Sequence, residues 1–187
     1  ELDSDDIAFF APKIKSWNRK IKISGDARGT VNDLKLEDLV VQAGGSTYFE
    51  GNASLFGLPD VDLTFIDLNA KEFRTTYADA LTYVPELRKV SQPAIHKLKF
   101  VRFNGSFTGF IRDFVTFGTI ETALGTITSD INMKLPKGGT PVYSGNIATS
   151  NFQLGSFLQN TTLGNIGFEG DVRGRGFQWS SLMVDID

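Results

Sequence analysis

The clearest pattern along the chain is an alternation of apolar and polar residues with a period of two. Between Ile127 and Leu135 the odd positions are mainly apolar and the even positions are polar. Because successive side chains of a β-strand point to opposite faces, this pattern predicts a strand with one apolar and one polar face. Similar alternation runs through 17–23 and 168–173, and in 168–173 charged residues take every second position. The sequence therefore predicts several strands that share the same one-sided design.

Two segments depart from this alternation and have the spacing of an α-helix. Residues 5–14 follow an acidic cluster suited to capping a helix, and Pro12 limits the length of the helix that we expect there. Residues 75–90 place apolar side chains on one helical stripe, and Pro85 forces a break within it. The second segment predicts a helical insertion between two β units.

Glycine recurs in a short motif in which the second residue after it is apolar. The motif begins at Gly25, Gly51, Gly105, Gly125, Gly145 and Gly170. The residues GDARG at 25–29 and GDVRG at 170–174 are nearly identical. The spacing is irregular, and the longest gap contains 75–90. This predicts a repeated β unit in which glycine relieves crowding where strands bend or approach closely. A β-sandwich would produce the same pattern.

The composition agrees with a mainly β fold. The 187 residues include 16 phenylalanines and 19 glycines but 2 methionines, a bias typical of strands and turns. The net charge of −3 argues against nucleic acid as a partner, since proteins that bind it concentrate Lys and Arg on one face. The absence of cysteine excludes disulfides, thiolate metal sites and cysteine nucleophiles.

The start of the chain does not resemble a targeting or anchoring segment. The chain opens on Glu1 without a methionine or a basic region, and no apolar run approaches the ~20 residues needed to cross a bilayer. We therefore expect residues 1–187 to form a single β-rich fragment of a longer chain, with its targeting information elsewhere.

The residues that could carry chemistry have simpler structural explanations. His96 is the one histidine in the sequence and has no cysteine to complete a zinc site. Asp3, Asp5 and Asp6 lack the glycine and the glutamate that a calcium-binding EF-hand loop requires, so we interpret them as helix-capping residues. We expect no catalytic residue, no metal and no cofactor, and hence no enzyme activity.

Several long runs resemble an internal segment of the TamB family, the translocation and assembly module proteins of Gram-negative bacteria, within the wider AsmA-like superfamily. The runs are FFAPKIKSWNRKIKISGDARGTVNDLKLEDL, TYFEGNASLFGLPD, FNGSFTGFIRDFVTFGTIETALGTITSDINMKLP, YSGNIATSNFQLGSFL and LGNIGFEGDVRGRGF. They cover nearly the whole chain, and what they share with the family is the placement of glycine and aromatic residues.

The resemblance implies a fold, a location and a function. Members of the family are long chains that an N-terminal segment anchors in the inner membrane. They span the periplasm as a β-taco or open groove, carry phospholipid between the membranes and end near an outer-membrane partner of the BamA/TamA type. For this chain the resemblance implies an elongated, curved antiparallel sheet with one or two short helices, located in the periplasm and anchored through a segment outside it.

In such a groove the apolar face of each strand would contact lipid. We expect the odd-numbered face at 127–135 to line it, together with the apolar residues that follow glycine in the repeats. The predicted lining residues are Ile127, Ile131, Met133, Leu135, Phe107, Ile147 and Val172. An acyl chain on this lining would gain about 0.8 kcal/mol for each buried CH₂.

Two other functions stay open, because periodicity does not distinguish an open groove from a sheet closed around a core. One is a scaffold for the assembly or secretion of outer-membrane proteins, which would offer a strand edge to its client. The other is a carbohydrate-binding β-sandwich, in which Trp17, Trp179 or a tyrosine would stack on sugars.

Overall fold

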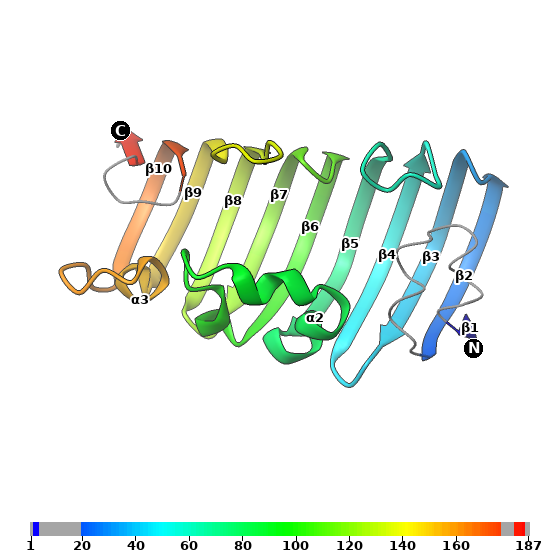
Figure 1. Cartoon of the computed structure of the whole chain (residues 1–187), viewed down its shortest axis with the longest axis horizontal. Helices are drawn as coiled ribbons and strands as arrows, with labels where there is room; N and C mark the ends of the chain where they lie inside the picture. The colour runs from blue at the N-terminus through cyan, green and yellow to red at the C-terminus, as the bar shows by residue number, and fades with distance from the viewer. Residues whose placement is uncertain (1, 4–19, 177–181, 186–187) are drawn as a thin grey trace.

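The strands form one open antiparallel sheet in which they follow each other in sequence order (Figure 1). The computed structural model describes residues 2–3, 20–176 and 182–185 of the 187-residue chain. The sheet has eleven strands, of which β1 and β11 at its two edges are short. The fold is therefore mainly β, as the sequence predicts. It is a single sheet rather than the two packed sheets of a sandwich.

The strands between the two short edge strands are 10 to 12 residues long. The bounds are β1 Leu2–Asp3, β2 Lys20–Thr30, β3 Asp33–Ala43, β4 Thr47–Phe56, β5 Phe65–Thr76, β6 Phe100–Phe110, β7 Asp113–Thr122, β8 Gly125–Lys134, β9 Val142–Phe152, β10 Ile166–Arg175 and β11 Leu182–Asp185.

The two faces of the sheet differ, as the alternation predicts. In β8 every odd position is buried or half-buried, whereas every even position from Thr126 to Lys134 is exposed. We call the face that carries Ile131 the inner face and the opposite one the outer face. Residues directly opposite each other in an antiparallel pair share a face. The inner face therefore continues from strand to strand across the sheet.

A row of small residues crosses the inner face at mid-strand. Ala70, Gly105, Gly118 and Ser129 lie opposite one another in β5 to β8. A Cβ at Gly105 would collide with the carbonyl oxygen of Phe117, and φ at this glycine is +154°. Where the row continues through β2 to β5, the pairing register shifts beside it. The sheet thus bends along a line that glycine permits.

The motif glycines do not all occupy this row. Gly51 lies in it, opposite Ala70. Gly145 lies one row nearer the upper edge, opposite Ile131, because β9 runs in the opposite direction to β4. Gly125 is the first residue of β8. The motif glycine therefore has the same place in β4, β6 and β10 but a different one in β8 and β9.

Short helices lie along the edge of the sheet that is lowest in Figure 1. The range 75–90, where the sequence predicts a helical insertion, contains α2 (Tyr77–Tyr83) and the 3₁₀ helix η2 (Pro85–Lys89), which begins at the proline. The 3₁₀ helix η3 (Ile95–Leu98) extends the insertion toward β6, and α3 (Leu154–Leu158) follows β9. Among the described residues no helix is long and apolar enough to cross a membrane.

Several of the best-buried apolar side chains lie where these helices meet the lower ends of the strands. Ala94, Leu124, Phe152 and Leu158 are at most 9% exposed. The ring of Phe152 meets that of Phe157 edge to face, with the centroids 5.7 Å apart. This lower-edge core joins the sheet to its helices.

Some of the sequence predictions lie outside the described residues. They are the helix at 5–14, the side chains of the acidic cluster and the two tryptophans, Trp17 and Trp179. The strand predicted at 17–23 is described from Lys20 onward, where it forms the start of β2.

Replacing Gly105 with alanine is expected to lower the free energy of unfolding by about 1–3 kcal/mol. The new methyl group collides with the neighbouring strand, and the backbone is at positive φ. Gly164→Ala is the control, because a Cβ there meets nothing within 4 Å. Urea unfolding followed by circular dichroism compares the two variants. Equal stabilities would contradict the close approach of the strands at this row.

Candidate functional site

One row of inner-face residues runs without interruption from β2 to β10. Ile131 in β8 lies opposite Thr116 in β7 and Gly145 in β9, and the pairing continues in both directions. The members in strand order are Ala27, Leu36, Ala53, Leu68, Phe107, Thr116, Ile131, Gly145 and Val172. We call this the Ile131 row. It brings residues from distant parts of the chain into one largely apolar stripe.

The Ile131 row contains three of the predicted lining residues, Phe107, Ile131 and Val172. Ile147 lies on the same face but in the next row, opposite Ser129. Its position after glycine is therefore not equivalent to that of Phe107, because β9 and β6 run in opposite directions.

Two other predicted residues, Ile127 and Met133, also lie on the inner face of β8, opposite Ile120 and Phe114 of β7. Leu135 does not belong to this face as a strand residue, because β8 ends at Lys134. Its backbone N–H donates instead to the carbonyl oxygen of Arg112, 2.7 Å away in the β6–β7 turn. The predicted strand ran one residue past the end of β8.

Two further apolar rows lie on the inner face, and sequence reasoning missed most of their members. One contains Val41, Phe49, Phe73, Phe103, Ile120 and Ile127, and the other contains Leu34, Leu55, Ile66, Gly109, Phe114, Met133 and Tyr143. Alternation within each strand could have identified these residues as apolar-face positions. It could not have aligned them, because the register between strands decides which residues meet.

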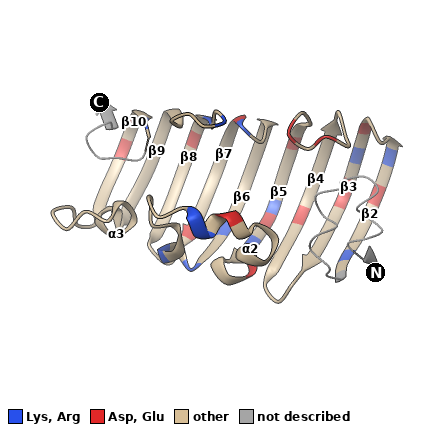
Figure 2. Ribbon diagram, viewed as in Figure 1, with Lys and Arg blue, Asp and Glu red and all other residues tan. Residues whose placement is uncertain are grey.

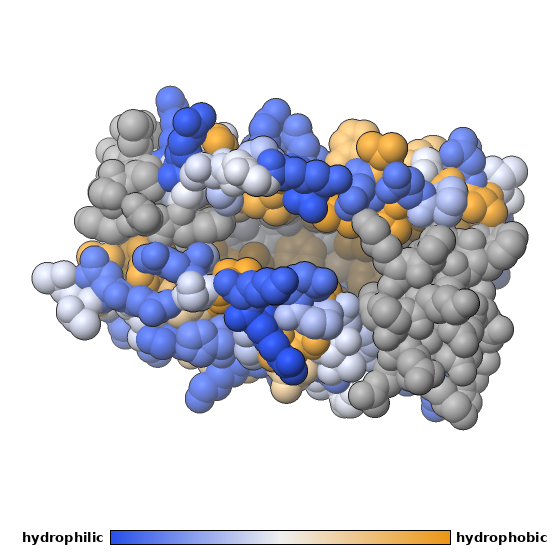
Figure 3. Space-filling model, in the orientation of Figure 1, coloured by the Kyte–Doolittle hydropathy of each residue, from blue (hydrophilic) through white to orange (hydrophobic). Residues whose placement is uncertain are grey.

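The phenylalanines of the inner face stay partly exposed, although Ile131 and Val172 on the same face are buried, at 7% and 5%. Among the phenylalanines of residues 20–176, Phe152 alone is buried, and it belongs to the lower-edge core. Phe49, Phe73, Phe103 and Phe107 on the inner face are all half-buried, whereas a closed core buries such side chains almost completely. Figure 3 shows a hollow with an apolar floor between the two edges of the sheet. The inner face is therefore an open groove.

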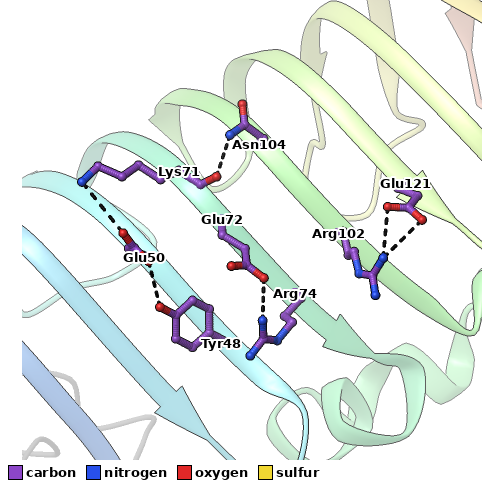
Figure 4. Close-up of polar contacts among 8 residues, drawn as sticks. All are labelled: Tyr48, Glu50, Lys71, Glu72, Arg74, Arg102, Asn104 and Glu121. Atoms are coloured by element: carbon purple, nitrogen blue, oxygen red, sulfur yellow. Dashed lines mark hydrogen bonds and ion pairs between the residues drawn. The ribbon is translucent and has the colours of Figure 1, made fainter.

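The middle of the outer face is polar, in contrast. Hydrogen bonds and ion pairs run along and between β4 to β7 (Figure 4). They join Glu50 to Tyr48 (2.9 Å) and Lys71 (3.9 Å), Glu72 to Arg74 (2.6 Å) and Glu121 to Arg102 (3.3 Å). The hydrogen bond to Glu50 is the main reason that the pKa of Tyr48 is raised. Exposed pairs of this kind contribute roughly 0–1 kcal/mol each, so we interpret this region as a solvated surface.

Nearer the upper edge, the outer face also carries exposed apolar side chains. The ring of Phe65 contacts those of Phe56 and Phe110, with centroids 6.5 and 5.6 Å apart. Val115 and Phe117 on β7 are exposed as well, Phe117 to 58%. Charged neighbours such as Asp113 on the same strand interrupt this second apolar surface.

Asp79 in α2 fastens the helical insertion to the β3–β4 turn. Its carboxylate accepts hydrogen bonds from the backbone N–H groups of Ser46 (2.8 Å) and Thr47 (2.9 Å) and from both of their hydroxyls (3.0 Å each). Partial burial alone would raise the pKa of Asp79, but these hydrogen bonds outweigh it and hold the pKa below its usual value. The insertion therefore has a fixed position at the lower edge.

The lone histidine is not part of a cluster. His96 is exposed, and its ring lies at an angle to that of Tyr77, with the centroids 6.4 Å apart. Across the part of the chain that the structure describes, no three His, Asp or Glu side chains come together in a way that could hold a metal ion.

The chain matches no protein-family model, no curated protein and no solved structure. The resemblance to the TamB family therefore stays a prediction from the sequence runs that carry it.

Replacing Asp79 with alanine is expected to lower the free energy of unfolding at pH 7 by about 1–3 kcal/mol, because several donors lose a charged acceptor. The pKa of Asp79 is lowered by folding, so its stabilisation is present above pH 3.8 and is lost as the pH falls through the folded-state value. Urea unfolding at pH 7 and at about pH 2 measures this, and the difference from wild type should shrink in acid.

The control for this experiment is Asp26→Ala, which removes an exposed carboxylate from β2. If the Asp79 and Asp26 variants lose the same stability at pH 7, the carboxylate does not fasten α2 to the β3–β4 turn.

Proposed function

We propose that this chain is one segment of a hydrophobic groove that holds the acyl chains of phospholipid and carries the lipid between the inner and outer membranes. The observation that supports this best is the inner face. Its rows of Phe, Ile and Leu side chains cross the sheet, and most of these side chains stay half-buried. Soluble proteins rarely leave apolar surface of this extent open without a ligand or partner.

An acyl chain suits this surface in both shape and chemistry. The Ile131 row and the two other apolar rows of the inner face contain no charged side chain among their described members. Each buried CH₂ contributes about 0.8 kcal/mol, and this gain depends little on the exact position of the chain along the rows. A lipid tail would therefore be held on the inner face without being fixed at one point, as transport requires.

The setting of this activity is proposed from the resemblance to the TamB family. It includes a place in the periplasm, a role in outer-membrane biogenesis, an anchor in the inner membrane through a segment outside this chain, and a BamA/TamA-type partner at the outer membrane. The groove needs no catalytic residue and no cofactor, so the proposal is for a protein that is not an enzyme.

A second candidate function is a scaffold for outer-membrane protein assembly. Within the described residues, β1 pairs with Lys20 and Ile21 of β2 alone, which leaves Lys22–Thr30 without a strand on that side. A strand edge of this length can add a strand of a client by backbone hydrogen bonding. The same experiment tests both candidates.

That experiment is photocrosslinking in cells, with the probe in the full-length protein at Ile131 or at Asn132. Ile131 lies on the inner face and is 7% exposed, whereas Asn132 points to the outer face. We expect lipid adducts from position 131 and none from 132. A third probe at Ala27 on β2 reports on the scaffold, because a client strand at this edge would give adducts with precursors of outer-membrane barrels. Equal lipid adducts at 131 and 132 would contradict the groove.

A charge on the inner face is expected to weaken lipid binding. Met133→Asp places a carboxylate on the half-buried floor, whereas Asn132→Asp adds the same charge one residue away on the exposed outer face. We expect the Met133 variant to lose about tenfold or more in affinity for a fluorescent fatty acid, because the charge must be desolvated against the acyl chain. The Asn132 variant should stay within about twofold of wild type. Similar losses in the two variants would contradict an inner-face site.

A further inference from the structure

The helical insertion concentrates positive charge. Between 77 and 99 the chain has four basic residues, Arg88, Lys89, Lys97 and Lys99, and two acidic residues, Asp79 and Glu86. This segment carries +2 in a chain of net charge −3, so the rest of the chain carries −5. We call the four basic residues the basic lip.

The basic lip is accessible to a ligand. The side chains of Arg88, Lys89 and Lys99 are exposed, and that of Lys97 is half-buried. None of the four has a carboxylate within 4.0 Å among the described residues. In this respect they differ from the cations of the outer-face ion pairs, whose charge is already compensated.

Arg88 and Lys89, the η2 residues of the basic lip, lie at the mouth of the groove. Figure 2 shows the basic turn of the insertion in front of the sheet, and Figure 3, in the same orientation, shows hydrophilic side chains over the lower edge of the apolar hollow. Val84 and Val90, on either side of η2, are 43% and 37% exposed. Cationic and apolar side chains are thus combined where the apolar floor meets solvent, a combination that suits an amphiphile.

The insertion is held in this place by the rest of the fold. Besides the contacts of Asp79 with the β3–β4 turn, the N–H of Ala123 in the β7–β8 turn donates to the carbonyl oxygen of Leu98 (3.0 Å). The N–H of Ala94 donates to the carbonyl oxygen of Phe157 in α3 (2.7 Å). These attachments fix the basic lip relative to the groove, so a ligand that spans both would not have to order the insertion first.

We propose that the basic lip binds the phosphate group of an anionic amphiphile whose acyl chain lies on the inner face. This inference rests on the proposed function and adds the place and charge of the headgroup. Arg88 and Lys89, which are adjacent in η2, act on one phosphate together, while the apolar rows hold the chain. The groove therefore selects anionic phospholipids over uncharged lipids of the same chain length.

The test compares two amphiphiles that differ in the phosphate alone, 1-palmitoyl lysophosphatidic acid and 1-monopalmitoylglycerol. Their dissociation constants are measured for the 187-residue chain by displacement of a fluorescent fatty acid at low ionic strength. We expect wild type to prefer the phosphate-bearing amphiphile. In the double variant R88Q/K89Q, the ratio of the two dissociation constants should fall by about 3- to 10-fold, whereas the affinity for monopalmitoylglycerol should stay the same. Raising the salt concentration should reduce the wild-type preference toward that of the variant.

The matched control is R173Q/R175Q, which also removes two positive charges from exposed side chains, on the outer face of β10. We expect it to keep the wild-type preference. If R88Q/K89Q also keeps it, the basic lip is not the headgroup site, although the groove proposal stands. If wild type binds neither amphiphile, both proposals fail. If glycerol 3-phosphate alone binds as tightly as lysophosphatidic acid, the lip is a free-phosphate site and the lipid assignment is overturned.

Discussion

The antiparallel pairing of strands in sequence order is the constraint on which the rest of the structure depends. Each strand pairs with its neighbours in the chain, so the register of one hairpin carries over to the next. Every apolar face then falls on the same side, and residues such as Phe107, Ile131 and Val172 align in one row. A slip of one residue in any pair would turn the apolar set of that strand outward. Cross-strand neighbours contribute roughly 0.2–1 kcal/mol per pair, and the many pairs of this sheet act together.

The bend of the sheet and the position of the lower-edge core explain why the apolar face forms an open groove. Small residues along the row of Gly105 and Gly118 let neighbouring backbones approach closely, and the register shifts lie beside the same line. The helices do not fold over the face to bury it. They pack at one edge, around Phe152 and Leu158, and Asp79 fixes their position there. The inner face is left as a groove with a rigid lower margin.

Three kinds of surface chemistry are kept apart by this arrangement. Ion pairs such as that of Arg102 with Glu121 lie on the outer face in solvent. Uncharged rows cover the inner face. The cations of the basic lip stand at the boundary of the groove with no carboxylate beside them among the described residues. A ligand with an apolar tail and an anionic head could contact both the uncharged inner face and the basic lip. A purely apolar ligand could use only the inner face, and a purely ionic ligand only the basic lip.

Local patterns determined the class of the fold and the character of its strands. Alternation in β8 predicted which side chains share a face, because side-chain direction in a strand depends on parity alone. The break at Pro85 followed from the missing N–H and fixed φ of proline. Only the tertiary structure decided that the apolar face is open and that Ile147 sits one row away from Phe107. It also decided that the basic residues of the insertion border the groove. These features depend on inter-strand register, strand direction and contacts between distant segments, and no periodicity within a single segment contains that information.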